Sequence, residues 1–483
     1  MTPYATRLLA LVLGCSTAPP AGALAQTASA APLRLRDAIA EALRTGPALS
    51  GASEAIENAR IRGKLAESRF GLKVVPNFNA GTAPASLGQR TLGVGLSKRL
   101  PFGGEITTSF DTFTFGTGAA AIHDAGYTVG VSQPLNRFGA AARVELDDTK
   151  RAIEGSERAM TEARHQVIVS VAERFFDVLK AQRLVRAGEL ALQRAQSLTA
   201  ASQARASVGL ATQLDVLRAD LLASQWHATL ANQRETLAAA ADDLNLLLGR
   251  SAAEPLDIAD EDLSDNALEA DGFRLPDSSP AAADRLVREA IAQRPAVREA
   301  RDRIADAARA VDVSHWNLLP PITFNANYMQ RGLGPSTTPG FADLLNGWRV
   351  GVTTSYGIDR ADQSAAVGIA AVGLRAAQRS ATDTERRVEA DVRRAYRAWS
   401  RSRETIELQR RTVDLAEKQL RLTTLRYERG LASSLDLVDA DGLVYQAQSA
   451  LIGAEVDRAL AALTLERVSG GLDPNRFTRT ERH

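Results

Sequence analysis

The sequence predicts a mainly α-helical protein with a β-barrel portion, built from a strand–helix unit that occurs twice. Three observations support this fold class: two long helical segments that each carry one heptad seam, short alternating strands before each of them, and matched blocks of sequence in the two halves of the chain. Each copy contains too few strands to close a barrel of at least ~8 strands. We therefore expect several copies of the chain to complete the barrel together.

The amino terminus, residues 1–25, is typical of a secretory signal peptide. Residues 8–33 carry no charge, and their apolar core at 8–13 is too short to span a bilayer. The Ala-Leu-Ala sequence at 23–25 provides a cleavage site of the A-x-A type. Cys15 offers an alternative, because the preceding Val-Leu-Gly is also similar to a lipoprotein cleavage box in which the cysteine is acylated. Both interpretations predict export from the cytoplasm.

The composition argues against an enzyme and against a nucleic-acid-binding protein. Lys and Arg number 58 against 57 Asp and Glu, so the formal charge of +1 provides no field that would bind a polyanion. The chain has a single cysteine, and its 5 histidines include no pair with ligand spacing, so zinc or nucleophile–base chemistry lacks the residues it needs. We therefore expect no enzyme activity, no cofactor, no metal site and no nucleic-acid partner.

The two halves of the chain match each other in sequence. Residues 209–220 and 430–441 share seven of twelve positions, including Gly-Leu-Ala at the start and a later Leu-Asp. Two earlier pairs of segments match in the same order, 42–49 with 290–297 and 75–80 with 320–326. These matches indicate a tandem duplication of a large unit. The predicted division is a signal peptide at 1–25, a first repeat at 26–253, an acidic linker at 254–279, a second repeat at 280–472 and a polar C-terminal tail at 473–483.

Each half contains a long helical segment with one narrow seam. In the second half an apolar or aromatic residue recurs every seven residues from Val392 to Tyr427, and the matching positions of the first half run from Val171 to Ala206. A heptad seam with small and polar neighbours is typical of coiled-coil packing, with the rest of the helix in water. We expect helices over about 140–207 and 365–429, each on the order of 100 Å long at ~1.5 Å per residue.

Short segments with alternating apolar and polar residues precede the long helices. Leu92, Val94 and Leu96 alternate with glycine and serine, and a similar alternation occurs at 127–132 and 348–353. This pattern suits a barrel wall with lipid on one face and water on the other. It equally describes a half-buried strand in the sheet of a soluble protein. The alternation therefore supports a barrel only together with the seams and the duplication.

These features together resemble the TolC family of outer-membrane channel proteins, also called outer membrane efflux proteins. The resemblance extends from residues 33–43 to residues 463–472, and its most specific mark is the pair of Gly-Leu-Ala turns, each followed by Leu-Asp. The resemblance implies a homotrimer, with a β-barrel in the bacterial outer membrane continued by a long periplasmic α-helical coiled-coil barrel. It also implies three kinds of partner: a periplasmic adaptor (membrane fusion) protein, an inner-membrane pump of the RND, ABC or MFS type, and outer-membrane lipid.

One region departs from the family pattern. The segments 92–100, 106–115 and 127–135 provide more strand-like sequence than the usual pair of strands in the first repeat. The Leu-Pro-Phe-Gly-Gly sequence at 100–104 is a strong turn signal. We therefore expect an added hairpin, whose location the sequence leaves open.

The resemblance places a periplasmic gate where the long helices reverse direction. The tips that would contact the adaptor are Val208, Gly209 and Leu210 in the first repeat and Arg429, Gly430 and Leu431 in the second. The residues that resemble the family's gate and selectivity ring are Asp215, Tyr427, Asp436 and Asp439. Repeated around a threefold axis, Asp436 and Asp439 would present six carboxylates to one opening and favour cations.

Each gate residue also has a simpler interpretation. The aspartates lie at helix starts, where acidic side chains are common because they interact favourably with the helix dipole. Tyr427 lies on the heptad seam, where packing alone would explain it. Ala432 stands where some family members carry a basic residue, so an ionic latch would have to use Arg426, Arg429 or another arginine.

The leading interpretation is a passive trimeric exit duct for small molecules, either drugs or metal ions, that a pump delivers. Two alternatives remain. One is the outer-membrane component of type I protein secretion, and the other is a soluble periplasmic coiled-coil adaptor or scaffold. A scaffold of that kind should have one long hairpin with compact β-domains around it, whereas this chain repeats a strand–helix unit. The cargo, the cognate pump and adaptor, and the open or closed resting state are not determined by the sequence.

Overall fold

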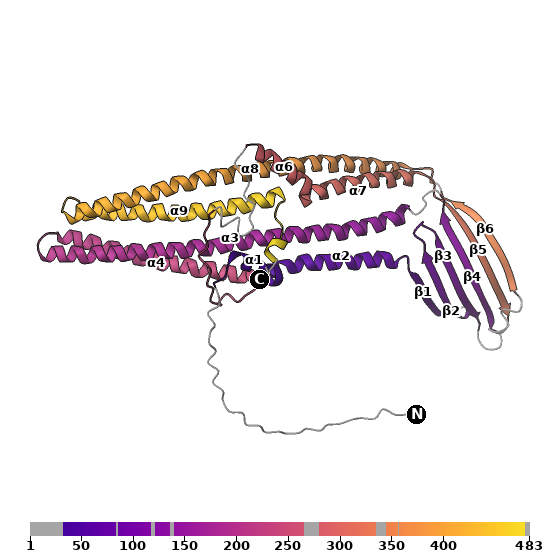
Figure 1. Ribbon diagram of the computed structural model, residues 1–483. Coiled ribbons are helices and arrows are strands. Elements are labelled where there is room, and N and C mark those ends of the chain that lie inside the picture. Colours follow the sequence, from indigo (N-terminus) through magenta and orange to yellow (C-terminus); the bar gives the residue numbers. More distant parts are fainter. Residues whose placement is uncertain are drawn as a thin grey trace, which may run out of the picture.

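The protein is elongated, with long paired helices and a curved sheet at one end (Figure 1). The computed structural model describes residues 32–83, 86–116, 121–135, 140–264, 280–334, 344–355 and 357–478. The predicted signal peptide, including Cys15, lies outside the described residues, as do parts of the expected linker and tail.

The helices occur in a similar order and with matching lengths in the two halves of the chain. α3 (Ala140–Ser207) and α8 (Ala361–Glu428) each contain 68 residues, and α4 (Gln213–Leu248) and α9 (Ser434–Ser469) each contain 36. The helix expected at 140–207 is confirmed, and the one expected at 365–429 begins earlier, at Ala361. The shorter helices that precede the long ones are α1 (Leu35–Thr45), a 3-10 helix (Pro47–Leu49) and α2 (Ser50–Ser68) in the first half, and α6 (Pro280–Gln293) and α7 (Pro295–Leu318) in the second.

The predicted heptad seam is buried at four of its six positions in α8 and at three of six in α3, and the remaining positions are partly buried. In α8, Val392, Trp399, Ile406 and Tyr427 are all at most 8% exposed, and in α3 Val171 is fully buried. Most of the residues between the seam positions remain partly or fully exposed, as expected for a narrow seam. Within the described ranges, no helix combines the length and the apolar character that a membrane crossing requires.

The helices lie side by side in a wall that keeps one lateral order along its length. Near the helix tips the order is α4, α3, α9, α8, because α3 packs along both α4 and α9, and α8 packs along α9. Toward the sheet the order is α2, α3, α7, α8. Figure 1 shows α8 along one margin of the wall and α2 and α4 along the opposite margin. A single chain therefore has two open margins.

Six antiparallel strands form one sheet in the order β1-β2-β3-β4-β5-β6. The added hairpin that the sequence could not locate lies inside this sheet, as β2 and β3 between β1 and β4. Because β1 follows α2 and β6 leads into α8, the sheet continues the lateral order of the helices. The strands are β1 (Leu72–Ala83), β2 (Ser86–Arg99), β3 (Glu105–Phe115), β4 (Ile122–Pro134), β5 (Ile322–Gly334) and β6 (Leu344–Thr354).

The two faces of the sheet differ in polarity across all six strands. Side chains alternate between the faces of a strand, so the register decides which residues share a face. One row across the sheet consists of Val74, Leu96, Thr108, Val129, Tyr328 and Trp348. The neighbouring row, on the opposite face, consists of Lys73, Ser97, Thr107, Gly130, Asn327 and Arg349. The predicted alternation therefore gives one largely apolar face and one polar face, and the added hairpin conforms to it.

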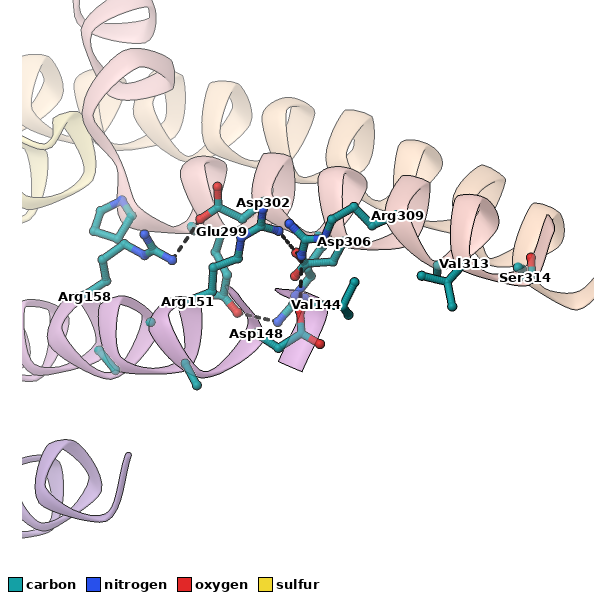
Figure 2. Close-up of a pocket in the computed structure, with 18 of the residues that line it drawn as sticks. Val144, Asp148, Arg151, Arg158, Glu299, Asp302, Asp306, Arg309, Val313 and Ser314 are labelled. Atoms are coloured by element: carbon teal, nitrogen blue, oxygen red, sulfur yellow. Dashed lines mark hydrogen bonds and ion pairs between the residues drawn. The ribbon is translucent and has the colours of Figure 1, made fainter. Parts of the chain in front are cut away.

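Near the sheet, α3 and α7 are joined by ion pairs instead of an apolar seam. The pairs are Arg158 with Asp302 at 2.8 Å, Arg309 with Asp148 at 3.3 Å, and Arg151 with Asp306 (Figure 2). They line a cavity of about 1310 Å³ between the two helices. Partly exposed ion pairs contribute about 0–1 kcal/mol each, so this part of the wall is joined less firmly than the apolar seams.

The main hydrophobic core lies midway along the molecule, where α1, α3, α4 and α9 meet. Ile39 of α1 and Phe175 and Phe176 of α3 are fully buried there. The C-terminal segment was expected to be a polar tail, but α10 (Asn475–Thr478) contributes Phe477, which is 3% exposed, to the same core. The described part of this segment is therefore anchored to the long helices.

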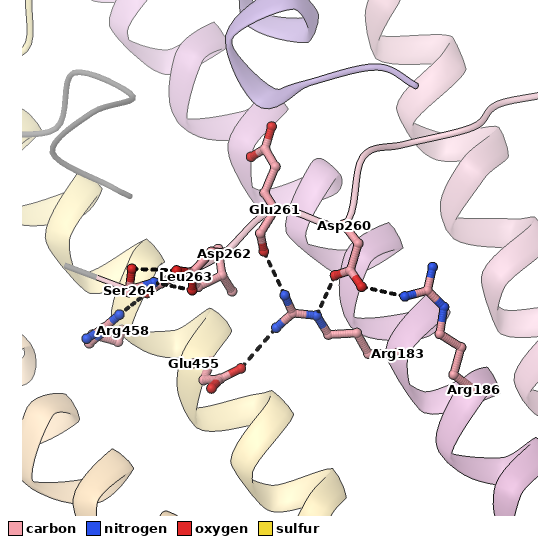
Figure 3. Close-up of polar contacts among 9 residues, drawn as sticks. All are labelled: Arg183, Arg186, Asp260, Glu261, Asp262, Leu263, Ser264, Glu455 and Arg458. Atoms are coloured by element: carbon pink, nitrogen blue, oxygen red, sulfur yellow. Dashed lines mark hydrogen bonds and ion pairs between the residues drawn. The ribbon is translucent and has the colours of Figure 1, made fainter. Parts of the chain in front are cut away.

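The described part of the expected linker, 254–264, lies across α3 and α9 at the level of this core. Arg183 of α3 donates hydrogen bonds to Asp260 at 3.0 Å and to the Glu261 carbonyl oxygen at 2.6 Å (Figure 3). The same guanidinium pairs with Glu455 of α9 at 2.9 Å. Arg186 also pairs with Asp260. Arg183 thus connects the linker to helices from both halves of the chain.

Candidate functional site

The two helical hairpins end in turns of the same geometry. Gly209 and Gly430 have φ of 76° and 73°, a conformation that residues with a Cβ rarely adopt. The amide of Leu210 donates to the carbonyl oxygen of Arg205 at 2.8 Å, and the equivalent bond joins Leu431 to Arg426 at 2.8 Å. These bonds satisfy carbonyl groups at the helix C-termini, as in a Schellman motif. The predicted tips are therefore the points where the hairpins reverse.

Two of the predicted gate aspartates form capping boxes immediately after the turns. Asp215 accepts hydrogen bonds from the amide of Thr212 at 3.0 Å and from its hydroxyl at 2.7 Å. Asp436 accepts the equivalent bonds from Ser433, both at 2.8 Å. Such boxes satisfy amides that a helix N-terminus leaves without partners. The structure thus shows the helix-start role for both aspartates, and a role in a selectivity ring stays a prediction.

These hydrogen bonds also keep the two carboxylates ionised. The hydrogen bond from the hydroxyl of Ser434, followed by those from the hydroxyl and the backbone amide of Thr212, holds the pKa of Asp215 below its ordinary value. The backbone amide of Ser433, followed by its hydroxyl, does the same for the pKa of Asp436. Hydrogen bonds to a carboxylate stabilise the charged form. Asp439 lies one turn further along α9 and is exposed, so the second tip presents acidic groups to solvent.

The tips themselves are apolar and exposed. Val208, Leu210 and Leu431 have exposed fractions of 68%, 78% and 66%. Arg429 and the two tip glycines are also exposed. Exposed apolar side chains clustered at the end of a molecule are typical of an interaction site.

Tyr427 joins the two hairpins near the tips. Its side chain is 8% exposed and packs in a cluster with residues of α3 and α4. Its hydroxyl lies 3.2 Å from the hydroxyl of Ser202. Arg205 donates to the carbonyl oxygens of Tyr427 and Glu428, both at 2.8 Å, and its guanidinium lies 4.5 Å from the Tyr427 ring centroid. The arginine that contacts this region is therefore Arg205 of α3, which the sequence did not single out.

Two further polar contacts connect the hairpins. The hydroxyl of Ser434 donates to Asp215 at 2.6 Å, which links the start of α9 to the start of α4. Deeper between the hairpins, Asp441 of α9 pairs with Arg194 of α3. Asp441 is 5% exposed, and burial raises the pKa of its carboxyl while Arg194 opposes the rise. A charged residue at a seam position of a helix predicts an oppositely charged partner on the facing helix, so Asp441 is the sequence signal for this contact.

The contacts around Tyr427 border a cavity of about 560 Å³ between the hairpins. Its lining includes Arg194, Arg205, Tyr427 and Asp441. Among the described residues, no three His, Cys, Asp or Glu side chains come together in a way that could hold a metal ion. The polar groups at this site contact neighbouring helices, an arrangement suited to holding two hairpins together or letting them separate.

Two curated proteins are similar in sequence to most of the chain. Nodulation protein T of Rhizobium leguminosarum bv. trifolii is 24% identical over 346 residues, which cover 70% of each chain. The pyoverdine export outer membrane protein OpmQ of Pseudomonas putida is 25% identical over 353 residues, which cover 69% of this chain and 68% of OpmQ.

Solved structures of outer-membrane proteins have the same fold. The open-state MtrE outer membrane channel of Neisseria gonorrhoeae superposes with a TM-score of 0.69 at 19% identity, covering 92% of this chain and 91% of MtrE. The outer membrane protein VceC of Vibrio cholerae gives 0.67 at 17% identity, covering 90% of this chain and 96% of VceC.

The family comparison covers both halves of the chain separately. The profile described as outer membrane efflux protein matches residues 38–250 and 286–471. These two segments contain both long hairpins, both tip turns and all six strands. The chain therefore belongs to the outer membrane efflux protein family.

Proposed function

We propose that this chain forms the outer-membrane exit duct of a tripartite efflux system. In this proposal three copies enclose one channel, which passes small molecules, drugs or metal ions, passively from a periplasm-spanning pump to the exterior. The observation that carries the proposal is the lateral order shared by the helices and the sheet, which leaves two open margins on opposite sides of one chain. A wall of this kind has no interior until its margins meet.

The margins of the helical wall carry complementary apolar stripes. On α8, Leu408, Leu415 and Leu422 follow each other at seven-residue spacing and are 61%, 65% and 59% exposed. On α4, Leu217 and Leu221 are 60% and 59% exposed. Seven-residue spacing is the signature of a coiled-coil partner. Contact between the α8 margin of one copy and the α4 margin of the next is head-to-tail, and such contacts close into a ring when the rotation between copies is a whole fraction of a turn, as in a trimer.

The sheet supports closure at the same two margins. β1 and β6 each have a neighbour on one side only. Unpaired edges of this length invite pairing with another chain. Three copies of the sheet would give a ring of roughly eighteen strands, within the range found for outer-membrane barrels. The apolar face would then meet outer-membrane lipid and the polar face would line the channel.

The hairpin tips are the proposed periplasmic entrance. Their exposed apolar residues Val208, Leu210 and Leu431 support a docking role toward a periplasmic adaptor, which would connect the duct to an inner-membrane pump of the RND, ABC or MFS type. The contacts of Arg205 and Tyr427 would hold the second hairpin against the first in the closed state. Asp436 and Asp439, both exposed, would give the entrance a preference for cations.

Conductance of the purified protein in planar bilayers tests this proposal. We expect stable single channels from a trimer, blocked by a multivalent cation such as hexamminecobalt(III) added at the periplasmic side. The double variant Asp436→Asn, Asp439→Asn should lose the block because the ring charge disappears. The double variant Asp312→Asn, Asp362→Asn removes two exposed carboxylates far from the tips and should keep it.

Three outcomes count against parts of the proposal. A protein that purifies as a monomer and forms no channel contradicts the exit duct. Unchanged block in the Asp436 and Asp439 variant removes these residues from the gate. A deletion strain that loses a secreted protein and keeps its resistance to drugs and metals would favour the type I secretion alternative.

A further inference from the structure

An arginine-rich cleft lies where α3, the start of α7 and the end of α9 meet. Its cavity measures about 680 Å³. Two acidic residues, Glu162 and Asp473, line it, so the arginines exceed the carboxylates by three. The arginines are Arg158, Arg164, Arg294, Arg298 and Arg467.

Two of these arginines are held in place by carboxylates. Arg158 pairs with Asp302 at 2.8 Å, and Arg467 pairs with Glu162 at 2.9 Å. The nearby His165, 3.7 Å away, and the hydrogen bond from Arg467 lower the pKa of Glu162 to about 2, so this carboxylate is ionised and its charge is balanced locally. These pairs occupy Glu162 and Asp302, while the other carboxylate of the lining, Asp473, accepts a hydrogen bond from the amide of Asn475 at 3.0 Å.

The other three arginines are less well balanced: Arg294 has one long ion pair, and Arg164 and Arg298 have none with a described residue. The nearest carboxylate to Arg294 is Asp391 at 3.9 Å, and the buried Nη1 of Arg294 has no hydrogen-bond partner. Arg164 and Arg298 are exposed, and no ion pair joins either of them to another described residue. A buried guanidinium nitrogen without an acceptor costs free energy that a bound anion would recover.

The excess of arginines over carboxylates is confined to this cleft and does not extend into the adjoining cavity between α3 and α7. There, Arg151 and Arg309 pair with Asp306, and Arg309 also contacts Asp148 (Figure 2). The arginine-rich cleft also faces the N-terminus of α7, which begins at Pro295 without a side-chain cap. The positive end of a helix dipole adds to the attraction for an anion.

We propose that this cleft binds a multivalent oxyanion, a molecule that presents two or more phosphate or carboxylate groups. Guanidinium groups bind such oxygens in pairs, and several arginines around one cavity require more than one anionic group. α7 separates the cleft from the sheet by its 24 residues, about 36 Å. The anion is therefore a soluble one and not a headgroup of the lipid around the sheet.

A bound anion would add one shared link among three helices at this place. Arg164 belongs to α3, Arg298 to α7 and Arg467 to α9. Bridging them would stiffen the wall between its ion-paired section and the mid-molecule core. This role does not depend on the cargo of the channel or on the state of the hairpin tips.

Isothermal titration calorimetry on the purified full-length protein in detergent tests the proposal. Inorganic pyrophosphate and citrate are the two probes, and their relative affinities report whether phosphate or carboxylate is preferred. Binding should weaken steeply as salt rises. The double variant Arg164→Gln, Arg298→Gln should lower the affinity for pyrophosphate at least tenfold, whereas Arg288→Gln, Arg375→Gln, which removes two exposed arginines elsewhere, should leave it unchanged.

Absence of binding to the wild-type protein, or an equal loss in both double variants, would overturn the proposal. Arg164 and Arg298 are exposed, so their replacement removes no core contact, and far-UV circular dichroism verifies folding. Single-channel conductance of the Arg164 and Arg298 variant should match the wild type. A failure of the anion site is therefore distinguishable from a failure of the exit duct.

Discussion

Three aspartates near the hairpin tips have the same side chain, but their carboxyl pKa values are shifted in different directions. Asp215 and Asp436 accept hydrogen bonds from the residue that caps the helix, which lowers the pKa of each carboxyl. Asp441 is buried beside Arg194, and burial raises its pKa. The two carboxyls with a lowered pKa therefore keep their charge to lower pH than an ordinary aspartate, and the buried one is the first of the three to lose it.

Replacing Asp215 by Asn tests the cap at the residue scale. A carboxyl whose pKa is depressed in the folded state contributes stability that is present above the unfolded pKa, ~3.9, and lost as the pH falls below it. At pH 7 the variant should melt roughly 1–3 °C below the wild type, since a neutral amide accepts weaker bonds. The difference should begin to shrink below about pH 4, because the unfolded chain then takes up a proton that the folded Asp215 carboxyl still resists.

Thermal unfolding followed by circular dichroism from pH 7 to pH 3 measures this difference. Asp220 is an exposed aspartate on the same helix without a described hydrogen bond, so Asp220→Asn serves as the control with a difference near zero throughout. If the difference in melting temperature between Asp215→Asn and the wild type stays constant or grows on acidification, the Asp215 carboxylate does not stabilise the protein through the cap.

At the scale of elements, α3 changes its kind of contact along its length. Toward the sheet it meets α7 through ion pairs (Figure 2), and midway it meets the linker and α9 through Arg183 (Figure 3). Toward the tips it packs against α4 through an apolar cluster that includes Ala191 and Trp226. The middle contact is the best placed to stay fixed while the tips move, because the main core surrounds it.

Replacing Arg183 by Met tests this middle contact. The guanidinium is 18% exposed and Glu455 is 23% exposed, so the variant leaves a largely buried carboxylate without its partner. The expected loss is about 2 kcal/mol in the free energy of unfolding, below the cost for a fully buried pair because solvent reaches both groups. Urea unfolding in detergent measures the loss, and limited proteolysis should cleave the segment 254–264 faster.

Arg186→Met is the matched control for this experiment. Arg186 lies one turn along the same helix and pairs with the same Asp260, but its side chain is 60% exposed. Its replacement should change stability by less than about 0.5 kcal/mol. If both variants lose equal stability, the linker is held by charge in general and not by the buried bridge of Arg183.

At the scale of the whole molecule, one chain is a wall with two unfinished margins. Figure 1 shows the sheet continuing the lateral order of the helices, with β1 on the α2 side and β6 on the α8 side. Leucines at seven-residue spacing remain exposed on α8, although each would gain from burial. These features explain the proposed trimer as a consequence of incomplete burial in the single chain.

Replacing Leu415 by Asp tests the proposed closure. Leu415 is 65% exposed in the single chain and would be buried in the ring, so a carboxylate there should shift the trimer–monomer equilibrium toward monomer by at least about tenfold. Native mass spectrometry in detergent measures the populations. Leu190→Asp is the control, because Leu190 is 54% exposed but lies on α3, inside the wall. An intact trimer for Leu415→Asp would place the interface elsewhere.

The sequence determined the features that depend on local periodicity and turn chemistry. The heptad seams, the long helix at 140–207, the alternation of the strands and the glycine turns at Gly209 and Gly430 all follow from neighbouring residues, and all are present. The duplication also showed in the sequence, because both copies preserve the residues that their turns and caps require.

Which distant groups meet depends on the packing of the whole chain. Arg205 and Tyr427 are 222 residues apart, and Arg194 and Asp441 are 247 apart, so no local pattern could pair them. The position of the added hairpin also depended on long-range pairing, since β2 joins β1 and β3 through backbone hydrogen bonds that any sequence of suitable pattern can form. Periodicity fixes which side of a helix or strand seeks a partner, whereas the partner itself is chosen by the packing of the whole chain.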